Sequence, residues 1–205
     1  MSPVERIVRY NLQERLVHAA AGITYVYLLL TGLAFWTPAL YWMAIVLGGG
    51  YLSRLLHPWI GLIFSGVLLV MWVSWRREMR TTPGDLEWRR HIVEYMTNRD
   101  EHVPPAGRFN YGQKQFFWLM VIASVALILS GVVLWGVGSV PGELAWLRYA
   151  AILIHSVSAL ATVGLFIVHL YMGIAVVPGG LSAIVRGEVT KDWARQHHSA
   201  WKTGP

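Results

Sequence analysis

Four histidines lie inside apolar stretches of the chain, and they are the residues best placed to do chemistry. Ionisable side chains within membrane-crossing segments are rare and usually face the interior of a helix bundle. A single one could bridge two helices by a hydrogen bond, but four require a shared explanation, and imidazole is a common metal ligand. The four are His18, His57, His155 and His169, whereas His91, His102, His197 and His198 lie in segments that also carry charge.

The spacing of these histidines predicts two pairs at two depths. His155 and His169 are fourteen residues apart, which on one helix is about 21 Å of rise and within about 40° in azimuth. By depth, His57 pairs with His155 and His18 pairs with His169. Two imidazoles facing across a bundle hold a haem iron with both axial positions filled, which suits electron transfer. Zinc fits less well, because it favours three or four ligands at one depth. The pairs therefore predict two b-type haems.

The residue four positions after each of these histidines is small. Residues i and i+4 stack on one helix face, so a larger side chain there would press on a flat macrocycle bound to the histidine. Membrane helices are also generally rich in small residues for close packing, so the pattern gives modest support. The four residues are Gly22, Gly61, Ala159 and Gly173.

The elements that must position these residues are four membrane-spanning helices. Only 14% of the residues are charged and 55% are hydrophobic, whereas a soluble domain is about 25% charged. No cysteine is present, which excludes iron–sulfur clusters held by this chain. We expect an all-α membrane protein, with residues 1–205 forming one four-transmembrane-helix bundle that binds two b-type haems. The helices are expected near 12–36, 55–75, 113–137 and 149–177, with an interfacial loop at 38–53, a loop at 76–112 and a tail at 178–205.

Basic residues predict the orientation of this bundle. Of the 17 lysines and arginines, only Arg54 and Arg148 fall in the connections after the first and third spans. Since lysine and arginine near helix ends stay in the cytoplasm, both termini, the 76–112 loop and the 178–205 tail are expected to be cytoplasmic. The basic charge then reports topology and contact with anionic membrane lipid, and no nucleic-acid partner is expected.

A polar segment before the third span is a candidate quinone site. The run Arg108-Phe109-Asn110-Tyr111-Gly112-Gln113-Lys114 brings two side-chain amides to the membrane surface, beside a backbone that Gly112 leaves open. A quinone carbonyl needs hydrogen-bond donors of this kind. The alternative is a polar segment that opens a helix, which Asn110 alone would explain as an N-cap.

Taken together, these motifs resemble the gamma, or cytochrome b, subunit of membrane-bound respiratory formate dehydrogenase. The resemblance covers nearly the whole chain. It rests on four segments: Arg15-Leu16-Val17-His18, Arg54-Leu55-Leu56-His57-Pro58, the Arg108–Lys114 run, and the pair His155 and His169.

The resemblance implies a diheme membrane anchor in the bacterial inner membrane. A molybdenum or tungsten subunit would oxidise formate, and an iron–sulfur subunit would pass electrons to the outer haem on His57 and His155. The inner haem, on His18 and His169, would pass them to menaquinone or ubiquinone, which would build a proton-motive force. The resemblance also implies a higher oligomer of the heterotrimer. The quinone residues that it implies are Asn110, Gly112, Gln113 and His169.

Two other interpretations of the sequence remain open. The same histidines would suit the cytochrome b anchor of a nickel–iron hydrogenase or of a thiosulfate or polysulfide reductase. A haem-free transporter or scaffold, in which the histidines bridge helices or relay protons, belongs to a different class. Such a protein would be colourless.

Overall fold

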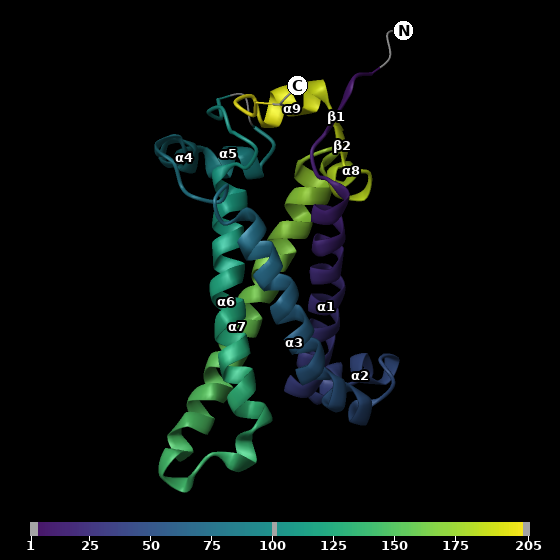
Figure 1. Ribbon diagram of the computed structural model, residues 1–205, viewed down its shortest axis with the longest axis vertical. Helices are drawn as coiled ribbons and strands as arrows, with labels where there is room; N and C mark the ends of the chain where they lie inside the picture. Colours follow the sequence, from purple (N-terminus) through teal and green to yellow (C-terminus); the bar gives the residue numbers. More distant parts are fainter. Residues whose placement is uncertain (1–3, 100–101, 203–205) are drawn as a thin grey trace. The chain divides into compact units, whose positions relative to one another are not determined.

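A computed structural model describes residues 4–99 and 102–202 of the chain, and four long helices dominate it (Figure 1). All four are long and apolar enough to cross a membrane, because about 20 apolar residues span the hydrocarbon core. The prediction of four spanning helices is confirmed. They are α1 (Leu12–Trp36), α3 (Gly50–Trp75), α6 (Tyr111–Trp135) and α7 (Ala145–Tyr171), the last continued by a π-helical turn, Met172–Val176.

The long helices expose apolar side chains that a water-soluble protein would bury. Ile63 on α3, Leu129 on α6 and Leu153 on α7 are each more than half exposed. A surface of this kind is stable when it faces lipid, where all backbone polar groups are paired within the helix. The chain is therefore an integral membrane protein.

The connection between α1 and α3 is shorter and more ordered than the expected 38–53 loop. A 3₁₀ turn at Pro38–Leu40 and the five-residue helix α2 (Trp42–Val46) follow α1 directly. Gly48 and Gly49 both adopt positive φ, a conformation that glycine reaches without steric cost. This turn lets α3 begin at Gly50, five residues before the expected start at 55.

The 76–112 loop and the 178–205 tail contain short elements that the sequence analysis did not predict. The strands β1 (Arg6–Val8) and β2 (Glu188–Thr190) pair antiparallel, with Ile7 opposite Val189. In the loop, Trp88, Tyr95 and Ala106 form a small buried core. The short helices are α4 (Pro83–Trp88), a 3₁₀ turn at Arg89–His91, α5 (Ile92–Met96), α8 (Gly180–Val185) and α9 (Lys191–His197).

The chain divides into two compact units that both draw on the long helices. One unit consists of Val17–Trp72 and Met120–Gly164, and it holds His18, His57 and His155. The other consists of the chain up to Leu16, Val73–Leu119 and the chain from Leu165 onward. The second unit holds the Asn110 segment, His169, both strands and the short helices of the 76–112 loop and the tail.

Candidate haem and quinone sites

Two of the four predicted histidines face each other within one unit. His57 lies on α3 and His155 on α7. Their ring centres are 6.4 Å apart, and the ring planes are inclined by 59°. The structure thus brings together one of the two pairs expected from depth.

The separation of these rings fits one metal ion between them. A histidine nitrogen bonds a metal at about 2 Å and lies about 1.1 Å from its ring centre, so two imidazoles on opposite sides of one metal have centres about 6 Å apart. A direct N–H···N bond between the rings would bring the centres to about 5 Å. The observed 6.4 Å is closer to the first arrangement. The pair therefore has the spacing to be the two axial ligands of a haem iron.

Each of these rings is hydrogen-bonded through Nδ1 to a hydroxyl on the neighbouring helix. The Nδ1 of His57 lies 2.7 Å from Oγ1 of Thr31, and the Nδ1 of His155 lies 3.0 Å from Oγ of Ser130. This leaves Nε2 of each ring as the nitrogen that can bind iron. Sequence reasoning missed Thr31 and Ser130, although each directly precedes a glycine and lies about one helix plus one connection before its histidine.

Within the part of the chain that the structure describes, no larger cluster of metal ligands competes with this pair. Across residues 4–99 and 102–202, no group of three or more His, Cys, Asp or Glu side chains is arranged to hold a metal ion. A site with two protein ligands suits haem, because the porphyrin supplies the remaining four nitrogens.

The two inner histidines fall in different units. His18 lies on α1 in the unit of His57, and His169 lies near the end of α7 in the other unit. Their pairing therefore stays a prediction. Within its own unit, the ring of His169 stacks on Phe116, with centres 4.6 Å apart and planes inclined by 11°.

The Asn110 segment forms a reciprocal cap at the start of α6. The backbone N–H of Gln113 donates to Oδ1 of Asn110, and the backbone N–H of Asn110 donates to Oε1 of Gln113, both at 3.0 Å. This is the capping-box arrangement. The alternative interpretation, that Asn110 is an N-cap, is therefore correct for its side-chain oxygen. Both side-chain oxygens are occupied, so a hydrogen bond from either amide to another molecule would have to come from its NH₂ group.

Gly112 lies directly beside this cap. A Cβ added there would lie 3.5 Å from Oδ1 of Asn110 and 3.9 Å from the ring of Trp88. Asn110 itself is almost fully buried. Gly112 is thus covered by the Asn110 side chain and the Trp88 ring, and the quinone site at this segment stays a prediction.

A buried ion pair fixes α4 against the first turn of α6. The ammonium group of Lys114 donates to Asp85 at 2.7 Å, and both side chains are more than nine-tenths buried. Burial alone would raise the pKa of Asp85, but the Lys114 ammonium and hydrogen bonds from Thr82 outweigh it and lower the pKa. Asp85 therefore stays ionised at neutral pH and holds Lys114 in place directly after Gln113.

A second network ties the N-terminal strand and the tail to the same segment. Arg9 donates to the backbone oxygen of Arg108 at 2.9 Å, and Arg108 donates to Glu14 and Glu78. Arg9 also lies 3.0 Å from Nε2 of His198. Burial, reinforced by the charge of Arg9, lowers the pKa of His198 to about 3. The ring is therefore neutral at neutral pH and can accept the hydrogen bond from Arg9.

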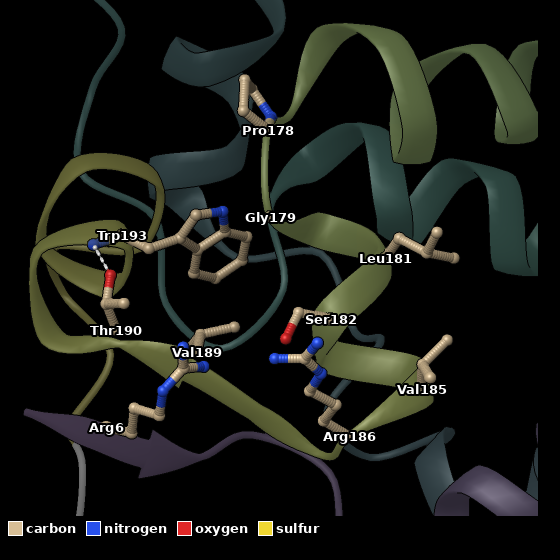
Figure 2. Close-up of a pocket in the computed structure, with 10 residues that line it drawn as sticks. All are labelled: Arg6, Pro178, Gly179, Leu181, Ser182, Val185, Arg186, Val189, Thr190 and Trp193. Atoms are coloured by element: carbon tan, nitrogen blue, oxygen red, sulfur yellow. Dashed lines mark hydrogen bonds between the residues drawn. The ribbon is translucent and has the colours of Figure 1, made fainter. Parts of the chain in front are cut away.

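A separate pocket lies between α8, β2 and the start of α9 (Figure 2). Its volume is about 510 Å³. None of the predicted haem or quinone residues lines it. Two guanidinium groups beside exposed apolar side chains would suit an anionic lipid headgroup. The polar lining comes from Arg6, Ser182, Arg186, Thr190 and Trp193.

Comparison with known families identifies the chain. The family model for prokaryotic cytochrome b561 matches residues 9–187, which include all four predicted haem ligands and the Asn110 segment. The chain belongs to the prokaryotic cytochrome b561 family. Membership implies b-type haem as the cofactor and electron transport as the role of the family.

Curated relatives cover nearly the whole chain. The formate dehydrogenase cytochrome b556(fdo) subunit of Escherichia coli K12 is 32% identical over 198 residues, which is 96% of this chain and 92% of the relative. The formate dehydrogenase cytochrome b556 subunit of Haemophilus influenzae is 31% identical, covering 96% of this chain and 82% of the relative. The nitrate-inducible formate dehydrogenase cytochrome b556(Fdn) subunit of E. coli K12 is 28% identical over 98% of this chain. The resemblance to formate dehydrogenase cytochrome b subunits is confirmed.

Proposed function

We propose that this cytochrome is the diheme membrane anchor of a formate dehydrogenase. His57 and His155 would hold an outer haem, and His18 and His169 an inner one. Bound haem supplies one-electron carriage, here from an iron–sulfur subunit toward a quinone. The observation that carries the proposal is the 6.4 Å separation of the His57 and His155 ring centres, which fits a shared iron.

The partners in this proposal follow from the relatives. Those relatives are named as subunits of formate dehydrogenases. Since this chain has no cysteine, clusters and the formate-oxidising molybdenum or tungsten centre would lie on other subunits. The complete enzyme would then be a heterotrimer, or a higher oligomer of it.

The residues of this chain would bind the haem irons, keep O₂ from them and orient the quinone. His57 with His155, and His18 with His169, would each hold one haem iron from both sides and leave no position for O₂. The amide groups of Asn110 and Gln113 would donate to a carbonyl of menaquinone or ubiquinone, beside Gly112 and His169. Reduction there would make quinol at this subunit, while formate is oxidised on a partner.

The distribution of basic residues indicates how the chain is oriented in the membrane, and so in which direction electrons would cross it. With both termini and the 76–112 loop in the cytoplasm of a bacterial inner membrane, His57 and His155 lie toward the outside and the quinone segment lies inside. Electrons moving inward while protons are taken from the cytoplasm would build a membrane potential. Each charge moved stores about 2.3 kcal/mol per 100 mV.

The haem content and the electron donor test the proposal directly. We expect a pyridine haemochrome assay of the purified protein to give about two haem b per chain, as four axial ligands require. In the intact complex, formate is expected to reduce both haems. A colourless protein would indicate a haem-free transporter or scaffold. Reduction of the haems by hydrogen or a sulfur compound, and not by formate, would indicate the anchor of a hydrogenase or of a thiosulfate or polysulfide reductase.

The small residue after His57 provides a test of haem fit that does not touch a ligand. A Cβ added at Gly61 meets no atom within 4 Å, so Gly61→Leu is not expected to clash with the protein itself. It would project from the face of α3 that carries His57 and press on a macrocycle there. We expect lower occupancy of the outer haem, measured by haem content, with the inner haem retained.

Gly66→Leu is the matched control on the same helix. Gly66 also has open space around an added Cβ, but it lies about 180° around α3 from His57. We expect full haem content in this variant. Equal haem loss in both variants, or none in Gly61→Leu, would contradict a haem seated against Gly61.

A further inference from the structure

The two hydroxyls beside His57 and His155 share a local pattern. Thr31 on α1 and Ser130 on α6 are both buried, with 0% and 5% exposure. Each is followed by a glycine whose added Cβ would meet the Cε1 of the same histidine, at 3.8 Å for Gly32 and 3.4 Å for Gly131. A hydroxyl-glycine dipeptide therefore lies against each ring: the glycine is in van der Waals range of the ring edge and the hydroxyl is hydrogen-bonded to Nδ1.

The direction of each hydrogen bond follows from what the hydroxyl already donates. Oγ1 of Thr31 lies 2.8 Å from the carbonyl oxygen of Tyr27, and Oγ of Ser130 lies 2.6 Å from that of Ala126. A carbonyl oxygen can only accept, so each hydroxyl uses its single proton there. The bond to the histidine must then run from the ring N–H at Nδ1 to the hydroxyl oxygen. Nε2 is left unprotonated, as a metal ligand has to be.

We infer that Thr31 and Ser130 are positioning residues that hold His57 and His155 as Nδ1–H tautomers and thereby lower the reduction potential of the outer haem. This inference rests on the proposed function, because it assumes that the two rings bind iron. Both residues act through the histidines and touch neither iron nor electron donor.

The effect on the potential has a physical cause. A hydrogen bond donated by Nδ1–H makes the imidazole more basic and strengthens its donation through Nε2. Stronger donation stabilises ferric iron more than ferrous iron, because the ferric ion carries the greater charge. Both axial ligands of the outer haem have this bond, so the two contributions act in the same direction.

Removing the hydroxyls one at a time tests the inference. Thr31→Val keeps the branched shape of the side chain, and Ser130→Ala removes only the oxygen. In the intact complex, each variant is expected to raise the outer haem potential and the double variant to raise it further. We expect each change to alter the ratio of reduced to oxidised haem at a fixed potential by up to about tenfold, which for one electron is about 59 mV. The measurement is an optical redox titration, with the g values of the low-spin ferric haem as a second readout.

Matched controls separate this effect from general loss of packing. Thr24 lies on α1 and donates to its own helix in the same way as Thr31, to the carbonyl of Ala20 at 2.7 Å. Thr24→Val is therefore expected to leave the outer haem potential unchanged. Thr31→Ser, which keeps the hydroxyl, is expected to retain the wild-type potential.

The outcomes distinguish this inference from the proposed function. The expected shift in potential would support the inference. Loss of the outer haem in Thr31→Val, but not in Thr31→Ser or Thr24→Val, would also support it, because it would show that the Thr31 hydroxyl strengthens haem binding by His57. Two haems with unchanged potentials in the Thr31→Val/Ser130→Ala double variant would overturn it and leave the diheme proposal standing. Haem content that does not depend on His57 or His155 would overturn the proposed function itself.

Discussion

Replacing His57 with alanine is expected to remove one haem from the protein and leave the other in place. The iron that His57 and His155 would share would lose one of its two histidine nitrogens, and no third His, Cys, Asp or Glu among the described residues is grouped with this pair to replace it. His155→Ala is expected to have the same effect, because each ring would supply one of the two protein ligands of the same iron. Haem content per chain should fall from about two to about one in either variant, measured by pyridine haemochrome.

The same variant is expected to interrupt electron flow from the partner subunits. With the outer haem absent, formate should no longer reduce the inner haem in the intact complex, although dithionite still should. His91→Ala is a suitable control, since His91 pairs with Glu94 outside the long helices at 3.0 Å. Retention of two haems in both His57→Ala and His155→Ala would show that this pair binds no haem.

The long helices could be predicted because each is a self-contained element. Each spanning helix satisfies its own backbone groups and needs only a long apolar run. Approximate helix bounds are then enough to give the depth of a histidine from its position along the apolar segment. The pairing of His57 with His155 could be anticipated for this reason alone.

The short elements could not be predicted because they depend on distant contacts. A three-residue strand such as β1 has no periodicity of its own, and it exists because it pairs with β2 near the other end of the chain. The contact of Arg9 with His198 joins residues 189 positions apart. Local composition carries no sign of such pairs, so the sequence predicts only a cytoplasmic tail at 178–205.

The hydroxyls of Thr31 and Ser130 escaped the sequence analysis for a different reason. Serine and threonine in membrane helices commonly bond the carbonyl one turn back, so their presence alone indicates nothing. What marks these two is the following glycine, Gly32 or Gly131, together with a histidine on the next long helix. The repetition of that pattern on α1 and α6 is visible in the sequence once the structure has shown its use.

Replacing Asn110 with aspartate is expected to impair quinone reduction while the backbone hydrogen bond that caps α6 is kept. An aspartate oxygen can accept the backbone N–H of Gln113 as Asn110 now does, and aspartate and asparagine are comparable N-caps. The variant removes the NH₂ donor and adds a negative charge. Loss of one hydrogen bond to the quinone carbonyl, about 1.4 kcal/mol, would slow turnover about tenfold. Gln113→Glu is expected to act in the same way, since Oε1 still accepts the N–H of Asn110.

Another helix of this chain provides the control for the cap. Asn11 and Glu14 form the same reciprocal pair at the start of α1, with both bonds at 2.9 Å. Asn11→Asp makes the same chemical change there and should leave quinol formation unaltered. Both haems should remain formate-reducible in all these variants, so a slower rate would lie in the quinone step. If Asn110→Asp and Gln113→Glu turn over quinone normally while Asn110→Ala loses helicity or haem, the segment is only a cap and the quinone binds elsewhere.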